Sequence, residues 1–232
     1  MNSLSNFPIT KRWPARHPDR IQLYTLATPN GIKVSVALEE LGLPYEAHKV
    51  SFATDDQLTP EFLSLNPNNK IPAMIDPDGP GGRPLPLFES GAILLYLADK
   101  TGRLIPSDPA RRWQCIQWLM FQMGGVGPFF GQFGHFFKFA ADKVKDPYAV
   151  NRYTAETRRL LGVLDGRLAG RTWMMDDEYT IADIATFPWV RTAGGFYGGG
   201  EVLGLAGFTN VTAWLERCLA RPASQRGIAV PA

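Results

Sequence analysis

The 232-residue sequence is 45% hydrophobic and has a net charge of +2, which is ordinary for a folded globular protein and excludes a disordered chain. Its Lys and Arg residues are scattered, with Arg pairs at 111–112 and 158–159 as the densest clusters, so there is no basic stripe for nucleic acid. No window approaches the roughly 18 apolar residues of a membrane span, and residues 1–20 lack the apolar core of a signal peptide. We therefore expect a cytoplasmic protein with neither nucleic-acid nor membrane partners.

The two cysteines also favour the cytoplasm, which is a reducing compartment. Cys115 and Cys218 lie about a hundred residues apart, each within an apolar helical pattern. This placement is typical of reduced core cysteines and not of a disulfide framework or a metal site. We predict two free thiols and no metal.

The first half of the chain alternates strand and helix patterns after an aperiodic arm. Residues 1–20 are punctuated by prolines, so we expect this arm to lie over a surface or a partner subunit. The patterns that follow predict strands at 21–26, 45–50, 73–76 and 84–89, helices at 31–41 and 90–102, and a short helical stretch at 59–67. The order is β-α-β-α-β-β-α, in which the first two strands should run parallel and the last two should form a hairpin. Ser90 is the expected N-cap of the last helix.

The second half shows long helical patterns and no strand-like run, which predicts a domain boundary between residues 102 and 108. The stretch "GGVGP" at 124–128 must bend or break a helix, because Pro128 lacks an N–H group. Thr180 and Asp183 have the spacing of a capping box. The expected fold class is α/β followed by an all-α domain.

The turn at residues 28–31, Thr-Pro-Asn-Gly, raises a chemical question. Thiol oxidoreductases often place Cys-x-x-Cys at a strand-to-helix turn, because N–H groups at the helix start stabilise a thiolate. This turn contains no cysteine. The question is which chemistry a thiol-type site can perform when its own sulfur is missing.

Four stretches in chain order carry a family resemblance: "TPNG", "NPNNKIPAMID", "LFESGAILLYLA" and "GGVGPFFGQFGHF". Together with the domain order they resemble the glutathione transferases, and among these the bacterial Nu class, also described as glutathione-dependent disulfide-bond oxidoreductases. The stretch "YTIADIATFPWV" is similar to the family's N-capping motif. The resemblance implies a thioredoxin-like, glutathione-binding domain at 21–104, a helical-bundle domain at 108–232, and glutathione as the co-substrate that supplies the reacting sulfur.

Several residues suit the γ-glutamyl and cysteinyl parts of glutathione. Glu89 can accept from the ammonium, and Ser90 with the free N–H groups of the helix start can hold the adjacent carboxylate, although helix capping alone would also explain both residues. The resemblance implies that Lys70 contacts glutathione and that Ile71-Pro72 is a cis pair whose Ile71 main chain bonds the cysteinyl part; an ordinary trans proline at a strand start is the alternative.

Thr28 and Asn30 are the predicted catalytic residues. Both can donate a hydrogen bond to sulfur, which favours thiolate over thiol. The alternative is that they serve only as turn and N-cap residues. By resemblance, Gln57 contacts glutathione near its glycyl end, and Arg152 reaches the ligand from the helical domain through its bidentate guanidinium.

The predicted second-substrate pocket consists of Phe129, Gln132 and His135, where family members often carry a further polar residue at the position of Phe133 or Gly134. Three functions remain open. The first is reduction of small disulfides or hydroperoxides by bound glutathione, without a catalytic protein cysteine. The second is conjugation of glutathione to hydrophobic electrophiles in a cleft lined by Phe129, Phe130 and Phe133. The third is a non-catalytic binding module.

The resemblance also implies a homodimer. The helix expected to face the partner is rich in aromatic and apolar residues, namely Trp113, Trp118, Phe121, Phe129 and Phe130.

Overall fold

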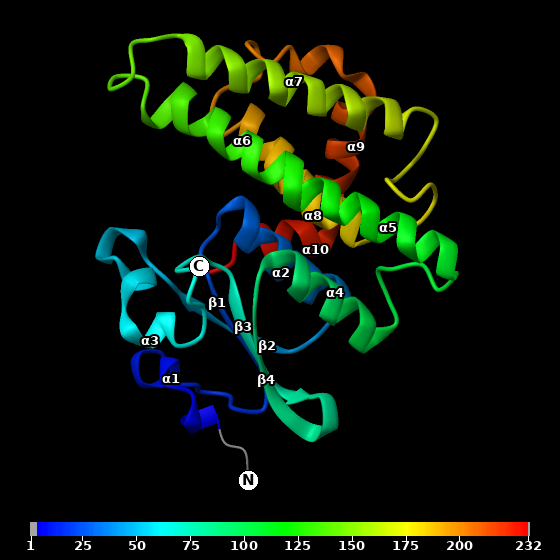
Figure 1. Ribbon diagram of the computed structural model, residues 1–232. Helices are drawn as coiled ribbons and strands as arrows, with labels where there is room; N and C mark the ends of the chain where they lie inside the picture. Colours follow the sequence, from blue (N-terminus) through cyan, green and yellow to red (C-terminus); the bar gives the residue numbers. More distant parts are fainter. Residues whose placement is uncertain (1–3, 232) are drawn as a thin grey trace. The chain divides into compact units, whose positions relative to one another are not determined.

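The computed structural model describes residues 4–231, which divide into two compact units (Figure 1). Among these residues, the N-terminal unit comprises 4–101 and 222–231, and the helical unit comprises 102–221. None of the described helices combines the length and the apolar character that a membrane crossing requires.

The N-terminal unit contains a four-stranded mixed sheet in the order β2-β1-β3-β4. Its strands are β1 (Ile21–Thr25), β2 (Tyr45–Lys49), β3 (Ala73–Gly79) and β4 (Arg83–Phe88). β1 runs parallel to β2 and antiparallel to β3, and β3 and β4 form an antiparallel hairpin, which confirms the predicted connectivity. Every residue of β1 is buried, so the central strand is covered on both faces.

The helices of this unit are α1 (Ile9–Arg12), α2 (Pro29–Leu41), α3 (Pro60–Leu63), α4 (Ser90–Thr101) and α10 (Pro222–Ile228). α2 packs against α4 and α10. The far end of α4 is tied to β3, because the buried carboxylate of Asp76 accepts from Tyr96 Oη at 2.6 Å and from Lys100 Nζ at 2.7 Å. These contacts fix α4, whose first residues belong to the candidate site.

Two parts of the sequence pack differently from the prediction. Residues 222–232 were assigned to the helical domain, but α10 docks on α2, where Ser35 Oγ donates to the carbonyl of Gly227 at 2.7 Å. The glycine is required, because a Cβ at position 227 would lie 2.7 Å from Val36 Cα. Helical periodicity shows that a segment is helical but does not identify the surface on which a short terminal helix docks.

The N-terminal arm likewise does more than lie over the surface, because some of its side chains are part of the core. Leu4 and Ile9 are 6% and 0% exposed and belong to the core cluster around Tyr24 and Phe62. The arm is also tied down by the Trp13 Nε1 hydrogen bond to the carbonyl of Lys49 at 3.0 Å. Its few apolar residues are too widely spaced to produce a periodic signal, although they add core contacts once the chain is folded.

The helical unit contains α5 (Pro109–Phe121), α6 (Gly127–Gly134), α7 (Tyr148–Leu168), α8 (Ile181–Gly194) and α9 (Thr209–Ala220). The "GGVGP" stretch does not break the chain into separate helices. A π-helical segment, Gln122–Val126, connects α5 to α6, and the N–H of Gly127 bonds the carbonyl of Gln122. The wider turn accommodates Pro128 without interrupting the helical path.

The capping box predicted at the start of α8 is confirmed. Asp183 is fully buried and accepts from the N–H groups of Thr180 and Met174, at 3.0 and 2.9 Å, and from Trp214 Nε1 at 2.8 Å. Burial raises the pKa of this carboxyl group, while the hydrogen bonds oppose the shift. Asp183 therefore joins the loop before α8, α8 itself and α9.

Candidate functional site

The start of α2 positions the predicted catalytic pair. Thr28 is the N-cap, its Oγ1 accepting from the Gly31 N–H at 3.3 Å, and Pro29 and Asn30 begin the helix. Because Oγ1 is the acceptor in that bond, the hydroxyl hydrogen of Thr28 can still be donated. Both Thr28 and Asn30 are half-buried. Thr28 therefore caps α2, and its hydroxyl hydrogen can in addition be donated to a ligand sulfur.

Gly31 completes the turn for steric reasons. A Cβ at this position would lie 2.0 Å from the carbonyl oxygen of Leu26 and 2.5 Å from Thr25 Oγ1. Only glycine allows α2 to begin this close to the end of β1.

The Ile71-Pro72 bond is cis, which confirms that prediction. Both residues are buried and directly precede β3, whereas Lys70 is exposed. The preceding turn is held by Asn66, whose Nδ2 donates to the carbonyl of Lys70 at 2.6 Å and whose Oδ1 accepts from the Asn68 N–H at 2.9 Å. The turn therefore fixes the entry of the chain into β3.

The start of α4 differs from the prediction by one position. Ser90 is the first helical residue and not the N-cap; the carbonyl of Glu89 accepts from the Ile93 N–H at 2.9 Å. Glu89 is exposed and has a φ of 70°, in the left-handed region that non-glycine residues seldom adopt. Ser90 is 3% exposed, so its hydroxyl lies at a buried helix start.

Sequence reasoning missed Lys33, which contacts this helix start. Its side chain is 0% exposed, and Nζ donates to Ser90 Oγ at 3.2 Å. Burial lowers the lysine pKa to about 7, with the carboxylate of Glu89 acting in the opposite direction. The available signal was a single charge within the otherwise apolar stretch "GIKVSVAL", a pattern usually interpreted as one solvent-facing position on a helix.

Gln57 lies in a short 3₁₀ turn, Asp56–Leu58, of the N-terminal unit. Its Nε2 donates to Asp55 Oδ1 at 3.4 Å, while Oε1 is buried and has no hydrogen-bond partner among the described residues. A buried acceptor of this kind suits an N–H donor of a ligand better than a carboxylate. Gln57 as a contact of the glycyl carboxylate therefore stays a prediction.

Arg152 belongs to α7 of the helical unit, where it lines a cavity of about 560 Å³. The other lining residues are Phe129, Tyr148, Asn151, Ala155, Glu156 and Arg159. Glu156 accepts from Arg159 at 2.9 and 2.7 Å, so one guanidinium of this cavity is paired within its own helix. The contact of Arg152 with glutathione stays a prediction.

The expected second-substrate residues separate into two groups. Phe129 lines the cavity, whereas Gln132 and His135 are exposed and are not among its lining residues. The proposed apolar cleft is wrong in two of its three members, because Phe130 and Phe133 are both 0% exposed. The π-helical segment inserts an extra residue before α6, which rotates its faces by about 100° relative to an uninterrupted helix.

Neither cysteine is placed for catalysis. Cys115 and Cys218 are free thiols with 0% exposure, as predicted from the sequence. Burial raises the pKa of the Cys115 thiol to about 11. A buried thiol of this kind remains protonated at neutral pH and is a poor nucleophile.

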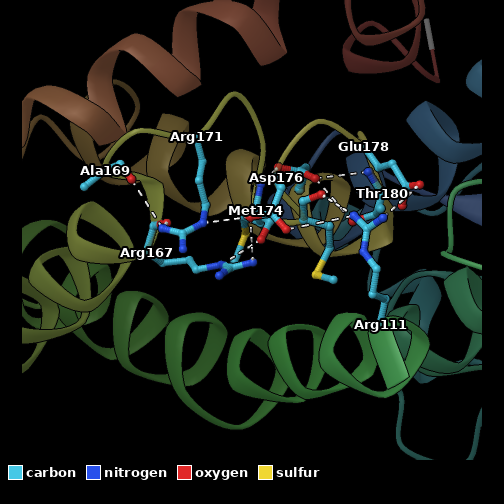
Figure 2. Close-up of polar contacts among 10 residues, drawn as sticks. Arg111, Arg167, Ala169, Arg171, Met174, Asp176, Glu178 and Thr180 are labelled. Atoms are coloured by element: carbon cyan, nitrogen blue, oxygen red, sulfur yellow. Dashed lines mark hydrogen bonds and ion pairs between the residues drawn. The ribbon is translucent and has the colours of Figure 1, made fainter. Parts of the chain in front are cut away.

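A separate polar network in the helical unit is structural. Figure 2 shows Arg111, Arg167 and Arg171 around the loop that joins α7 to α8. Arg171 Nε donates to Asp176 Oδ1 at 2.8 Å, and Arg167 Nε donates to the carbonyl of Met174 at 2.8 Å. These guanidinium groups bind carboxylate and carbonyl oxygens of the loop, so they hold its conformation.

Comparison with known proteins identifies the family. The model of the glutathione S-transferase N-terminal domain matches residues 28–100, and that of the C-terminal domain matches residues 126–222. The chain belongs to the glutathione S-transferase family. The match covers the starts of both α2 and α4, which hold the candidate site.

Two similar proteins carry the name disulfide-bond oxidoreductase. The chain is 44% identical over 209 residues to disulfide-bond oxidoreductase YfcG of Escherichia coli, covering 90% of this chain and 94% of the relative. It is 43% identical to disulfide-bond oxidoreductase YghU of the same organism, covering 91% of this chain and 74% of the relative.

Two solved structures of glutathione transferases are similar to this chain over nearly its whole length. A glutathione transferase from Burkholderia graminis, with two glutathione molecules bound per subunit, is 64% identical with a TM-score of 0.98, covering 100% of this chain and 96% of the other. One from Pseudomonas putida, with one glutathione disulfide bound per subunit, is 60% identical with a TM-score of 0.97, covering 99% of this chain and all of the other.

Proposed function

We propose that this protein is a glutathione-dependent disulfide-bond oxidoreductase in which glutathione supplies every reacting thiol. The observation that carries the proposal is the start of α2: Thr28 and Asn30 occupy the turn where related chemistry uses a cysteine, while Cys115 and Cys218 are completely buried. The names of YfcG and YghU support the reaction class. The two glutathiones in the Burkholderia graminis protein and the glutathione disulfide in the Pseudomonas putida protein support the substrate.

The chemistry consists of two thiol–disulfide exchanges. A glutathione thiolate attacks one sulfur of a small disulfide, forming a mixed disulfide and releasing the other half as a thiolate, which takes up a proton. A second glutathione thiolate then attacks the glutathione sulfur of the mixed disulfide. This step forms glutathione disulfide and releases the second half of the substrate, so two glutathiones are oxidised for each disulfide reduced.

The protein's residues contribute binding and electrostatic stabilisation. Thr28 and Asn30 donate hydrogen bonds to the sulfur as it attacks or leaves, supported by the free N–H groups at the start of α2. Ile71 pairs with the cysteinyl part, and Glu89 and Ser90 hold the γ-glutamyl ammonium and carboxylate. Lys70, Gln57 and Arg152 remain proposed ligand contacts.

Three finer features belong to the same proposal. The four sequence stretches support a place in the Nu class, and the two free, buried cysteines support a reducing, cytoplasmic setting. A homodimer is supported by the exposed Trp113 and Met120 on α5, which are 67% and 52% exposed. Hydroperoxide reduction would use the same thiolate.

Turnover of bis-hydroxyethyl disulfide with glutathione, compared with conjugation of chlorodinitrobenzene, tests the proposal. We expect disulfide reduction to exceed conjugation by about tenfold or more, because Phe130 and Phe133, two of the three residues expected to line an apolar cleft for electrophiles, are completely buried. Predominant conjugation would favour the transferase alternative. A protein that binds glutathione but turns over neither substrate would be a binding module.

A further inference from the structure

Asp56 is a buried carboxylate in the turn that carries Gln57. The two residues are neighbours in the same 3₁₀ turn, and Asp56 is 7% exposed. Its Oδ2 accepts from the Ser51 N–H at 2.8 Å, and its Oδ1 accepts from Thr54 Oγ1 at 3.1 Å. Its own main-chain N–H donates to the carbonyl of Ser51 at 3.1 Å. Asp56 therefore holds together the loop that joins β2 to α3.

The cation that binds this carboxylate comes from the N-terminal arm. Arg12, the last residue of α1, donates from Nη2 to Asp56 Oδ1. The arginine side chain is 40% exposed and the aspartate side chain 10% exposed, so the pair lies at the boundary between the interior and solvent. Burial raises the pKa of the Asp56 carboxyl group, but its hydrogen bonds and the Arg12 charge outweigh that effect, and the pKa lies below its usual value. Asp56 is therefore ionised at neutral pH, and the arm supplies its countercharge.

The arm also contacts both ends of this loop. At the start of the loop, Trp13 Nε1 donates at 3.0 Å to the carbonyl of Lys49, the last residue of β2. At the end of the loop, the Trp13 ring packs edge-on against Phe62 of α3, with ring centroids 6.4 Å apart, and α1 packs against α3 (Figure 1). The Arg12 guanidinium lies 5.2 Å from the centroid of the Trp13 ring. The arm thus contacts the chain before, at and after the turn that carries Gln57.

The side-chain carbonyl of Gln57 can accept a hydrogen bond from a ligand. Its Oε1 is buried and no described residue donates to it, while Nε2 donates to Asp55 Oδ1 at 3.4 Å. Asp55 has a φ of 50°, so the backbone directly before the turn has a left-handed conformation that non-glycine residues seldom adopt. A buried acceptor without a donor is costly, because it has lost its hydration. The glycyl amide N–H of glutathione is a donor that this acceptor can bind.

We propose that Arg12 is a positioning residue for glutathione binding, because through Asp56 it holds the turn in which Gln57 accepts from the glycyl amide N–H. The inference rests on the proposed function, since it assumes that glutathione binds with its glycyl end at Gln57. Arg12 acts through Asp56 and does not itself contact the ligand. Loss of the guanidinium leaves Asp56 without its countercharge, so the turn gains freedom and Gln57 is less well oriented before the ligand binds.

The principal experiment combines variants of the arm with a truncated ligand. Arg12→Ala removes the guanidinium, and Lys11→Ala removes an exposed cation from the neighbouring position of α1. Dissociation constants are measured by calorimetry for glutathione and for γ-glutamylcysteine, which lacks the glycine and its amide N–H. We expect Arg12→Ala to weaken glutathione binding by about fivefold and γ-glutamylcysteine binding by less than about twofold. Lys11→Ala should weaken neither by more than about twofold.

A double-mutant cycle tests whether Arg12 acts through Gln57. Gln57→Ala should weaken glutathione binding by about tenfold, because it removes the acceptor itself. Adding Arg12→Ala to Gln57→Ala should then weaken binding by less than about twofold, since there is no longer an amide side chain to position. Two losses that multiply would show that Arg12 and Gln57 act independently.

The outcomes separate this inference from the proposed function. If the wild-type protein fails to bind glutathione, the proposed function fails. If it binds glutathione and Gln57→Ala binds as tightly, the inference fails while the proposed function stands. A loss of less than about threefold in Arg12→Ala overturns the inference. Equal losses for the two ligands, or multiplying losses in the cycle, also overturn it, because they indicate that the arm contributes only to the stability of the unit.

A second measurement uses only the wild-type protein, in case Arg12→Ala does not fold. Binding and turn order are linked reciprocally, so a ligand held by Gln57 also stabilises the turn. Hydrogen exchange of the Ser51 N–H, which donates to Asp56 Oδ2, is followed by NMR with saturating glutathione and with saturating γ-glutamylcysteine. We expect this exchange to be about threefold or more slower with glutathione than with γ-glutamylcysteine. Equal exchange rates with the two ligands overturn the inference.

Discussion

Lys33 in the N-terminal unit and Asp183 in the helical unit are both fully buried charged side chains, but they serve different ends. Asp183 accepts from main-chain and side-chain donors of the loop before α8 and of α9, all within the folded interior. Lys33 instead donates to Ser90, and the carboxylate of the exposed Glu89 raises its pKa against the effect of burial; Ser90 and Glu89 are both predicted ligand contacts. Asp183 therefore joins elements of one unit's interior, whereas Lys33 contacts the start of α4, where two predicted ligand contacts lie.

The largest effect is expected from Asp183→Ala. Removing the carboxylate leaves the Met174 N–H and the Trp214 indole N–H buried without their acceptor. We expect a loss of about 3–5 kcal/mol in the free energy of unfolding, measured by urea titration with circular dichroism. Asp142→Ala, an exposed control, should change stability by less than about 0.5 kcal/mol. A small loss at Asp183 would contradict its structural role.

Lys33→Met, by contrast, is expected to raise the free energy of unfolding of the ligand-free protein. Its pKa is about 7 in the folded protein and 10.5 as the ordinary value, so between these the unfolded chain binds more protons and wild-type stability rises with pH. The cost of burying the charge is fully present below about pH 7, where Lys33→Met should have its greatest stability advantage over wild type.

That advantage should shrink by up to about 1.4 kcal/mol for each pH unit between about 7 and 10.5. Urea titrations of both proteins at about pH 7 and about pH 9 provide the comparison, with Lys11→Met, the same change at an exposed position of α1, as the control. A difference that does not vary with pH would show that Lys33 has the same protonation state in the folded and unfolded protein.

A smaller effect, on turnover, should follow from Asn30→Ala. Loss of the side-chain donor at the start of α2 should lower disulfide turnover by about tenfold, equivalent to about 1.4 kcal/mol of transition-state stabilisation. Steady-state kinetics with saturating glutathione separates this effect from weaker binding. Full activity in Asn30→Ala would limit Asn30 to a role in the turn.

The sequence predicted what short-range periodicity encodes. The β-α-β-α-β-β-α succession, the parallel β1–β2 pair, the β3–β4 hairpin and the α8 capping box follow from local patterns and short connections, whereas the β1–β3 pairing of the sheet was not predicted. The burial of Phe130 was missed, because one extra residue in the π-helical segment changes which face of α6 is buried. Similarly, the docking of α10 on α2 depends on close packing at Gly227, which periodicity does not report.

The residues of the candidate site also differ in whether a local sequence signature marks them. Thr28, Asn30, Glu89 and Ser90 could be proposed because cap residues at helix starts have local signatures. The buried position of Lys33 could not be proposed, because it depends on a contact with Ser90, 57 positions away along the chain. A lone lysine in an apolar helix is predicted to be exposed unless the partner helix is known.

The central claim is that glutathione, and not the protein, supplies the reacting sulfur. Its most direct test is disulfide turnover by the double variant Cys115→Ala/Cys218→Ala, after circular dichroism has shown that it is folded. We predict activity within about threefold of wild type, with a stability loss of about 1–2 kcal/mol from the buried sites. Loss of turnover to the uncatalysed level in the folded, cysteine-free protein would contradict the account and identify a protein thiol as the nucleophile.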